Sequence, residues 1–178
     1  IPASRQSLLF SATYPEGIKE ISGSVQRDPI EIRVEDSHHS PDIEQVFIKV
    51  EKSERIQTLF NVLAHYQPES TLIFCNTKQQ CHDLRRELRE LGLQALALHG
   101  DLEQFERDQV LTQFAGKSAS ILIATDVAAR GLDVKELAAV INFELSRDPE
   151  VHIHRIGRTA RAGSKGLAVS LFAAADKR

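Results

Sequence analysis

Short apolar runs alternate with helical segments through most of this sequence, and this alternation constrains the fold more than any other feature. Six runs have the length of buried strands and are bounded by turn residues: 43–50, 71–75, 94–98, 121–125, 139–143 and 167–172. Apolar residues at helical spacing indicate helices between them, at 52–66, 77–92 and 102–115. Strands that alternate with helices favour a parallel sheet with helices on both faces. The sequence therefore predicts an α/β fold.

The helix expected at 77–92 has recognisable ends. Thr77 and Gln80 have the spacing of a capping box, and Gly92 suits the residue after a helix. Its buried face is predicted by four residues at helical spacing, Cys81, Leu84, Leu88 and Leu91. A defined start places this helix directly after the strand at 71–75.

A polar stretch near the N-terminus predicts a boundary between two parts of the chain. The segment EDSHHSPD at 35–42 contains one proline and no apolar residue, which is typical of a linker. Before it, SLLFSAT at 7–13 and IEIRV at 30–34 have the composition of strands. We therefore expect a first part at 1–40, which ends in the linker, and a second part at 41–178. The chain has no Met, even at position 1, so we expect residue 1 to be an excision point.

Composition narrows the class of protein without naming a function. The chain has 42% hydrophobic and 26% charged residues, which is ordinary for a globular domain. The formal net charge of -3 means that any binding to nucleic acid must depend on locally placed Lys and Arg. Two cysteines, Cys75 and Cys81, make neither a disulfide framework nor a zinc site, which favours a reducing cytoplasmic compartment. No apolar run is long enough to cross a bilayer, so we expect no membrane partner.

Polar and basic residues follow several of the predicted strands. Asn76 and Thr77 follow the strand at 71–75, and Asp126 follows the strand at 121–125. The strand at 94–98 is followed by a longer polar set, His99, Gly100, Asp101, Gln104 and Arg107. In parallel sheets, ligands bind beyond the carboxyl ends of the strands. Loops are polar in general, but polar and basic residues recur here at several successive strand ends. This recurrence predicts a ligand-binding edge of the sheet.

Three arginines at steps of three form the densest signal in the sequence. Arg155, Arg158 and Arg161 are spaced to lie along one helical face or turn. Like charges at this spacing repel and favour an anionic partner, and guanidinium groups suit phosphate oxygens. Alternatively, the arginines are solvated or pair with nearby acids, Glu144, Asp148 and Glu150. Spacing alone leaves both interpretations open.

Three other patterns have simpler explanations. Gly116-Lys117-Ser118 resembles the end of a P-loop, but the earlier glycine that a P-loop requires is replaced by Leu111. His152 and His154 lack a third ligand at suitable spacing, so we expect no metal site. Ser11 has no histidine or acid at a spacing that would make it a nucleophile.

Taken together, these segments resemble the motifs of the DEAD-box family of ATP-dependent RNA helicases. Ser11-Ala12-Thr13 resembles the family's third motif and LIFCNT at 72–77 its fourth. HGDLEQFERD at 99–108 contains the Gln-x-x-Arg element, and ATDVAARGLD at 124–133 resembles the fifth motif. HRIGRTAR at 154–161 resembles the sixth, except that Ala160 replaces the more usual glycine. The resemblance covers nearly the whole chain.

The resemblance implies a RecA-like fold and a division of labour between two lobes. Residues 1–40 would be the tail of the first lobe plus the linker, and 41–178 the second lobe. The amino-acid sequence of residues 142–163 is similar to that of the bacterial DbpA type, which acts on large-subunit ribosomal RNA. Because the P-loop and the Asp-Glu-Ala-Asp motif are missing here, the chain alone is expected to be inactive. Mg²⁺ and most of the ATP would be held by the first lobe of the same protein.

The resemblance also assigns residues to ATP. Arg158 and Arg161 would reach the γ-phosphate as arginine fingers, and Gly131 with Asp133 would lie at the nucleotide, Asp133 near a ribose hydroxyl. Arg155 would brace the lobe internally, against an acid such as Asp126.

RNA would lie on the opposite side of the cleft. The residues of this lobe expected to contact it are Thr77, Gly100, Arg107 and Thr125. Ser11 and Thr13 would couple ATP to unwinding. The alternatives are the lobe of a DNA-directed superfamily 2 translocase and a non-catalytic RNA-binding module of the same fold.

Overall fold

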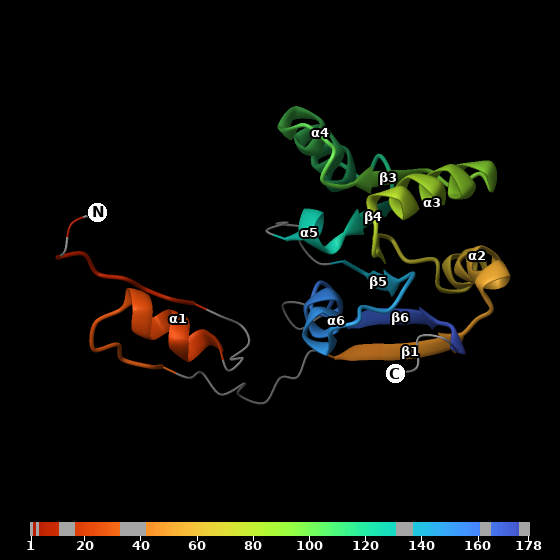
Figure 1. Ribbon diagram of the computed structural model, residues 1–178. Coiled ribbons are helices and arrows are strands. Elements are labelled where there is room, and N and C mark those ends of the chain that lie inside the picture. Colours follow the sequence, from red (N-terminus) through yellow and green to blue (C-terminus); the bar gives the residue numbers. More distant parts are fainter. Residues whose placement is uncertain are drawn as a thin grey trace. The chain divides into compact units, whose positions relative to one another are not determined.

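The computed structural model describes residues 2, 4–10, 17–32, 42–130, 137–160 and 165–174. The chain divides into two compact units, Ile1–His38 and His39–Arg178. Figure 1 labels the helices and strands of both units. The larger unit contains all the strands among the described residues and therefore contains the candidate site.

Within the described residues, the larger unit contains one six-stranded sheet with the order β1-β6-β5-β2-β4-β3. Every neighbouring pair of strands is parallel. The strands are β1 (Ile43–Lys49), β2 (Thr71–Cys75), β3 (Ala95–Leu98), β4 (Ile121–Thr125), β5 (Ala139–Asn142) and β6 (Gly166–Phe172). All six strands predicted from the sequence after residue 42 are confirmed, each to within one residue at either end.

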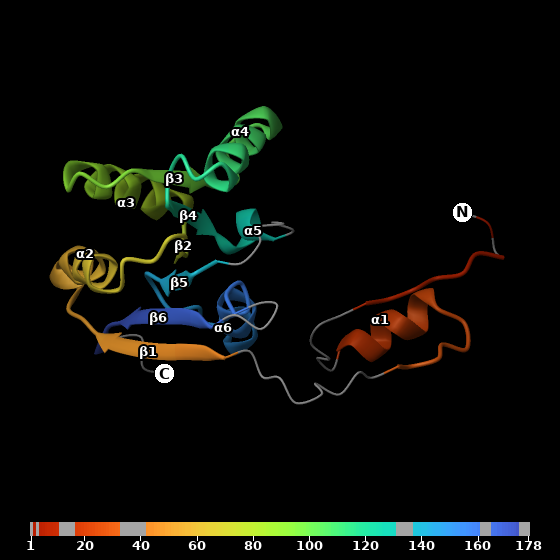
Figure 2. The same cartoon turned by 180° about the vertical axis from the view of Figure 1, so that it is seen from behind.

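Helices cover both faces of the sheet, as the alternation of elements predicted. They are α2 (Arg55–Tyr66), α3 (Lys78–Glu90), α4 (Gln104–Ala115), α5 (Asp126–Ala129) and α6 (Pro149–Ile156), with a 3-10 turn η1 (Lys52–Glu54) before α2. The helices α2 and α3 lie on one face, and α4, α5 and α6 on the other (Figures 1 and 2).

The core has two layers because alternate residues of each strand point to opposite faces. In β2, Ile73 and Cys75 pack with the residues of α2 and α3. Leu72 and Phe74 pack instead with residues of α4 and α5. All five residues of β2 are buried, which is the pattern of a central strand in a parallel sheet.

The helix after β2 begins where the sequence predicts. The Thr77 hydroxyl accepts from the Gln80 backbone N–H at 3.2 Å, and the Gln80 side chain accepts in return from the Thr77 N–H. This capping box begins α3 at Lys78. Gly92, after the helix, has a φ of 81°, a conformation that glycine adopts more easily than other residues.

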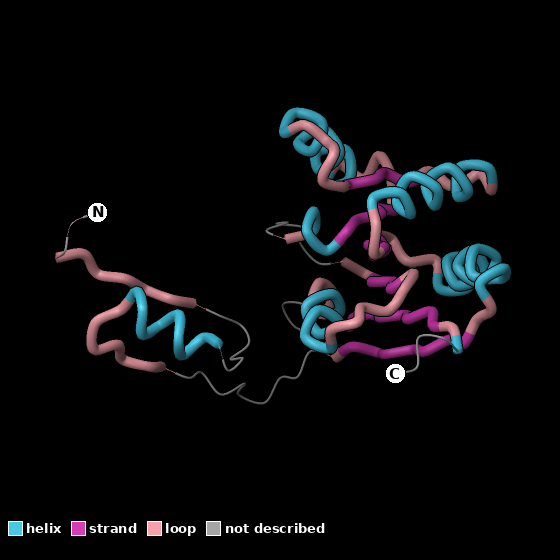
Figure 3. Tube along the Cα trace, viewed as in Figure 1, coloured by secondary structure: helices cyan, strands magenta, loops and turns pink. Residues whose placement is uncertain are grey.

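The smaller unit contains one described helix, α1 (Gly17–Val25), and the strand predictions there are wrong where they can be examined. Residues 7–10 and 30–32 have no regular secondary structure (Figure 3). Leu8, Phe10, Ile30 and Ile32 are 69–89% exposed. A strand needs the backbone of a neighbour to bond to, and no strand pairing involves the described residues of this unit. The rest of the two predicted segments lies outside the described residues.

Among the residues that the structure describes, no helix combines the length and apolar composition needed to cross a membrane.

Candidate nucleotide and nucleic-acid site

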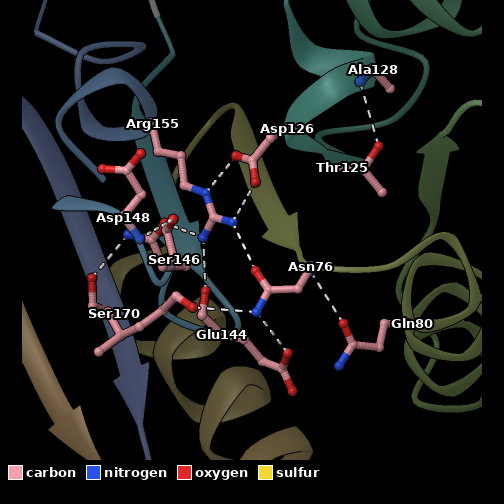
Figure 4. A network of polar contacts seen from close by, with 12 residues as sticks. Asn76, Gln80, Thr125, Asp126, Ala128, Glu144, Ser146, Asp148, Arg155 and Ser170 are labelled. Atoms are coloured by element: carbon pink, nitrogen blue, oxygen red, sulfur yellow. Dashed lines mark hydrogen bonds and ion pairs between the residues drawn. The ribbon is translucent and has the colours of Figure 1, made fainter. Parts of the chain in front are cut away.

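The carboxyl ends of β2, β4 and β5 meet around one arginine that α6 contributes. Asn76 follows β2, Asp126 follows β4 and Glu144 lies shortly after β5. The helix α6 begins locally because the Asp148 carboxylate accepts from the Glu150 N–H at 2.9 Å and Pro149 follows as the first helical residue. Arg155 lies near the end of this helix and points into the strand ends (Figure 4).

Arg155 uses all five of its N–H donors inside the protein. Its Nε donates to Asp126 Oδ1 at 2.7 Å, and Nη2 donates to Asp126 Oδ2 at 2.8 Å. Nη2 also donates to Asn76 Oδ1 at 2.9 Å. Nη1 donates to the Asn142 side-chain oxygen at 3.2 Å and to the Glu144 carbonyl oxygen at 2.8 Å. Because a guanidinium has five donors, none remains for a ligand.

The surroundings of Arg155 fit a structural role. The residue is 2% exposed, and its guanidinium lies over the Phe74 ring at 5.1 Å from the centroid. A buried charge is tolerated only when it is paired and hydrogen-bonded, and the bidentate Asp126 carboxylate satisfies both conditions. The contact between Arg155 and Asp126 that the resemblance implied is therefore present.

The network extends in two directions from Arg155. Towards β6, the Asn142 amide donates to the Ser170 hydroxyl at 2.9 Å, with both residues buried. Towards α2, the Arg55 guanidinium donates to the Phe143 carbonyl oxygen at 2.7 Å and lies 3.8 Å from the Glu144 carboxylate. The strand ends are therefore held together by polar contacts as well as by the sheet.

Of the helical face or turn that the spacing predicts, the two described arginines form the turn, because the Arg158 N–H donates to the Arg155 carbonyl at 3.2 Å. The helix α6 ends at Ile156 and Gly157 caps it, donating its N–H to the Ile153 carbonyl at 2.9 Å. Arg155 is inside the helix and buried, whereas Arg158 lies beyond its end and is half-buried. Glycine favours helix termination, and the spacing of three could not reveal it. Arg161 lies outside the described residues.

The turn that carries Arg158 is attached to the sheet at Thr159. The Thr159 hydroxyl donates to the Leu137 carbonyl, and the two residues form an isolated parallel bridge. Ala160 follows with a φ of 54°, a conformation that favours glycine. The family's usual glycine at this position is explained by this backbone geometry. The attachment holds the backbone beside Arg158 against the segment that leads into β5.

Two of the four residues predicted to contact RNA are N-caps of helices. Thr77 caps α3, and the Thr125 hydroxyl accepts from the Ala128 N–H of α5 at 3.4 Å. Each hydroxyl accepts from the helix and keeps its own proton for donation outward. The Arg107 guanidinium donates to the Ala128 carbonyl at 3.2 Å, so Arg107 and Thr125 meet at α5.

Gly100 lies at the end of β3 and is exposed, with open space where a side chain would be. Its neighbour Asp101 pairs with Lys78, the residue after Thr77, at 2.9 Å. This ion pair connects the loops that follow β2 and β3 and lowers the pKa of Asp101. Gly100 and Thr77 are thereby linked, and they form a second group beside that of Arg107 and Thr125.

A histidine pair lies next to this edge. His99 is 3% exposed, and its ring centroid lies 4.2 Å from that of His82. Burial and the neighbouring His82 lower the pKa of His99, which favours the neutral ring. Burial likewise lowers the pKa of His152, with a smaller contribution from Arg155. Within the described residues, no group of three or more His, Cys, Asp or Glu could hold a metal ion.

Several predicted site residues lie outside the described residues: Ser11, Thr13, Gly131, Asp133 and Arg161. The network also includes Asn76, which the sequence placed at the ligand-binding edge, and Glu144, which it offered as an acid partner of the arginines, whereas Asn142 and Ser170 were not predicted. A signal for two of them was available, because Asn142 and Ser170 are polar residues within otherwise apolar strands. Gly116, which looked like part of a P-loop, ends α4 by donating its N–H to the Thr112 carbonyl at 2.9 Å.

Comparison with known proteins identifies the family. Residues 51–163 match the helicase conserved C-terminal domain. The ATP-dependent RNA helicase DbpA of Escherichia coli K12 is 57% identical over 172 residues, which cover 97% of this chain and 38% of DbpA. The ATP-dependent RNA helicase DBP2 of Saccharomyces cerevisiae is 42% identical over 178 residues, 97% of this chain and 33% of DBP2. The chain thus spans about a third of the length of these relatives.

Solved structures agree with this assignment. The structure of S. cerevisiae Dbp5 bound to RNA and ADP BeF3 has a TM-score of 0.87 at 30% identity, covering 96% of this chain and 46% of that one. A DEAD box protein from Methanococcus jannaschii has a TM-score of 0.73 at 40% identity, covering 94% of this chain and 45% of that one. The sheet and helices are therefore those of a RecA-like lobe. The chain belongs to the DEAD-box RNA helicases and contains their C-terminal helicase domain.

Proposed function

We propose that this chain supplies one half of an ATP site and part of an RNA-binding surface in an ATP-dependent RNA helicase. Its relative DbpA is named as such a helicase, and the similar Dbp5 structure was solved with RNA and ADP BeF3. Because the chain covers 38% of DbpA, the other half of the ATP site would come from another lobe of the same protein.

The observation that carries this proposal is that all five N–H donors of Arg155 are used within the protein. Five donors directed at acceptors within the protein leave this arginine unable to bind phosphate. The half-buried Arg158 lies beyond the end of α6, on a turn attached through Thr159, and we propose it for the phosphate because its place in the motif resembles that of an arginine finger. Arg161 would be the second finger, on the strength of the resemblance. In this proposal, the internal brace and the phosphate contact would be different arginines.

The residues present fit ATP phosphates better than they fit the metal. Arginine suits phosphate oxygens, whereas Mg²⁺ prefers carboxylate oxygens and water. ATP bound with Mg²⁺, held mainly by the first lobe, supplies the phosphoryl group on which negative charge develops. Arg158 and Arg161 would stabilise that charge, and an arginine in this role is worth about 10³–10⁵ in kcat. Asp133, with Gly131, would position the ribose.

The contacts to RNA would position the RNA backbone and would not read its base sequence. Thr77 and Thr125 would offer hydroxyl donors to the RNA. Gly100 would offer a backbone that no side chain covers, and Arg107 would offer a guanidinium. Contacts of these kinds to phosphates carry no sequence information. Closure of two lobes around ATP and RNA would complete the site, and Ser11 and Thr13 would couple ATP to unwinding. From the resemblance of residues 142–163 to the DbpA type, we further propose a cytoplasmic protein that acts on large-subunit ribosomal RNA during ribosome assembly.

A comparison of nucleic acids tests the proposal. In the full-length protein that contains this chain, RNA should stimulate ATP hydrolysis at least about tenfold more than DNA of the same sequence. Equal or greater stimulation by DNA would favour a DNA-directed translocase. Absence of hydrolysis with either nucleic acid would favour a non-catalytic RNA-binding module. The isolated 178-residue chain should show no hydrolysis, and RNA-stimulated turnover by that chain would contradict the two-lobe account.

A further inference from the structure

Asn76 stands between the part of the lobe proposed to meet RNA and the arginine that braces the α6 region. It follows the last residue of β2 and precedes Thr77, the N-cap of α3. Its backbone N–H donates to the Gln80 side-chain oxygen at 3.2 Å, as the Thr77 N–H also does. The backbone of Asn76 therefore belongs to the same cap that positions Thr77.

The side chain of Asn76 faces the other way, towards α6 and the end of β5. Its Oδ1 accepts from Arg155 Nη2 at 2.9 Å. Its Nδ2 donates to Glu144 Oε2 at 3.1 Å and to the Leu145 carbonyl at 3.3 Å. Figure 4 shows this amide between the guanidinium and the carboxylate.

The chemistry of these partners fixes the orientation of the amide. A guanidinium can only donate and a carboxylate can only accept, so the amide oxygen must face Arg155 and the nitrogen must face Glu144. An aspartate at this position would oppose the Glu144 carboxylate, and an apolar residue would satisfy neither partner. A shift of α6 against the strand ends changes the Arg155 contact and therefore bears on the loop that holds Thr77.

We infer that Asn76 is a positioning residue that couples nucleotide binding to RNA binding in this lobe. The inference rests on the proposed function, because it assumes that Arg158 meets ATP and Thr77 meets RNA. Arg155 makes its other contacts with Asp126, Asn142 and the Glu144 backbone. The Asn76 contact is the one that leads directly into the α3 cap. Asn76 itself needs to touch neither ligand.

The test measures RNA affinity of the full-length protein with and without a non-hydrolysable ATP analogue, by fluorescence anisotropy of a labelled single strand. The ratio of the two affinities is the coupling between the sites. In Asn76→Ala this ratio should fall at least about fivefold, while RNA affinity without nucleotide changes less than about twofold. The matched control is Gln79→Ala, since Gln79 lies in the same first turn and its side-chain amide donates to the Asp83 carboxylate, away from Arg155 and Glu144. The control should keep the wild-type ratio.

A charge swap distinguishes positioning from simple loss of structure. Asn76→Asp places two carboxylates face to face and should reduce the ratio at least as much as the alanine variant. Adding Glu144→Gln restores a donor opposite an acceptor and should recover at least half of the lost coupling. Melting temperatures should be compared for all variants, because a structural role would lower both affinities and the melting temperature together.

The outcomes separate this inference from the proposed function. If the wild type shows a coupling ratio of one, the proposed function fails and the inference fails with it. If the wild type is coupled and Asn76→Ala keeps its ratio, the inference alone is overturned. A fall in both affinities, or a double variant without recovery, also overturns it.

Discussion

Replacing Arg155 by methionine should destabilise the chain severely, because the change removes five hydrogen-bond donors from a buried position and leaves their acceptors behind. Methionine fills much of the same volume and can remain against Phe74, so the loss is mainly polar. The acceptors differ in how easily water can replace the guanidinium. The Asp126 side chain is 29% exposed and can be partly hydrated, whereas Asn142 is fully buried.

The magnitude follows from these acceptors. A buried acceptor left without a partner costs about 1–3 kcal/mol, and the Asn142 oxygen and the Glu144 carbonyl are the two most affected. Removing one partner of a buried ion pair costs about 3–5 kcal/mol, which agrees with that sum. For a chain of this size, each kcal/mol shifts the melting temperature by about 2–4 °C. Arg155→Met should therefore lower the melting temperature by about 6–20 °C.

Circular dichroism of the 178-residue chain during heating would measure the shift. Arg147→Met is the matched control, since Arg147 is exposed in the loop before α6 and should change stability by less than about 0.5 kcal/mol. A melting temperature for Arg155→Met within about 2 °C of the wild type would refute the reasoning that this guanidinium holds the strand ends together.

Three further predictions concern RNA binding, pH and packing. Arg107→Ala should weaken RNA binding by the full-length protein and reduce the slope of log affinity against log salt by about one, and an unchanged slope would remove Arg107 from the RNA surface. Because the pKa values of His99 and His152 are lowered in the folded chain, the unfolded chain takes up protons first as the pH falls through the ordinary histidine pKa of about 6.5, and the folded state loses stability. The free energy of unfolding in denaturant titrations should therefore be greater at pH 7.5 than at pH 5, and His99→Asn should make the pH dependence shallower. Gly166→Ala should destabilise the chain by about 1–3 kcal/mol in the same titrations, because the added Cβ would lie 2.6 Å from the Ala160 backbone nitrogen.

The fold of the larger unit was predictable because local patterns and burial agree there. β2 is apolar along its whole length and fully buried, and the Thr77 capping box begins α3 where the spacing indicates. The smaller unit behaves differently. Residues 7–10 have the composition of a buried strand and are unpaired and largely exposed, because composition cannot supply the neighbouring strand.

The candidate site was predictable in its residue types and less so in its contacts. The resemblance placed Arg155 against Asp126, and that contact is present. The spacing of the arginines suggested one helical face or turn, and the cap at Gly157 places Arg158 in the turn that follows α6. Asn76 was visible only as a polar residue after a strand, because its partners are 68 and 79 positions away in the sequence. Contacts at that distance are set by the sheet order, which no local pattern encodes.

If this lobe contributes an arginine to ATP bound between two lobes, as we propose, removing that arginine should slow hydrolysis far more than it weakens nucleotide binding. Arg158→Ala should be made in the full-length protein, with RNA-stimulated ATP turnover and nucleotide affinity measured side by side. We expect kcat to fall by about 10³ or more while the Kd for nucleotide changes far less, because an arginine finger acts mainly on the transition state. A loss of nucleotide affinity with kcat unchanged at saturation would contradict the account.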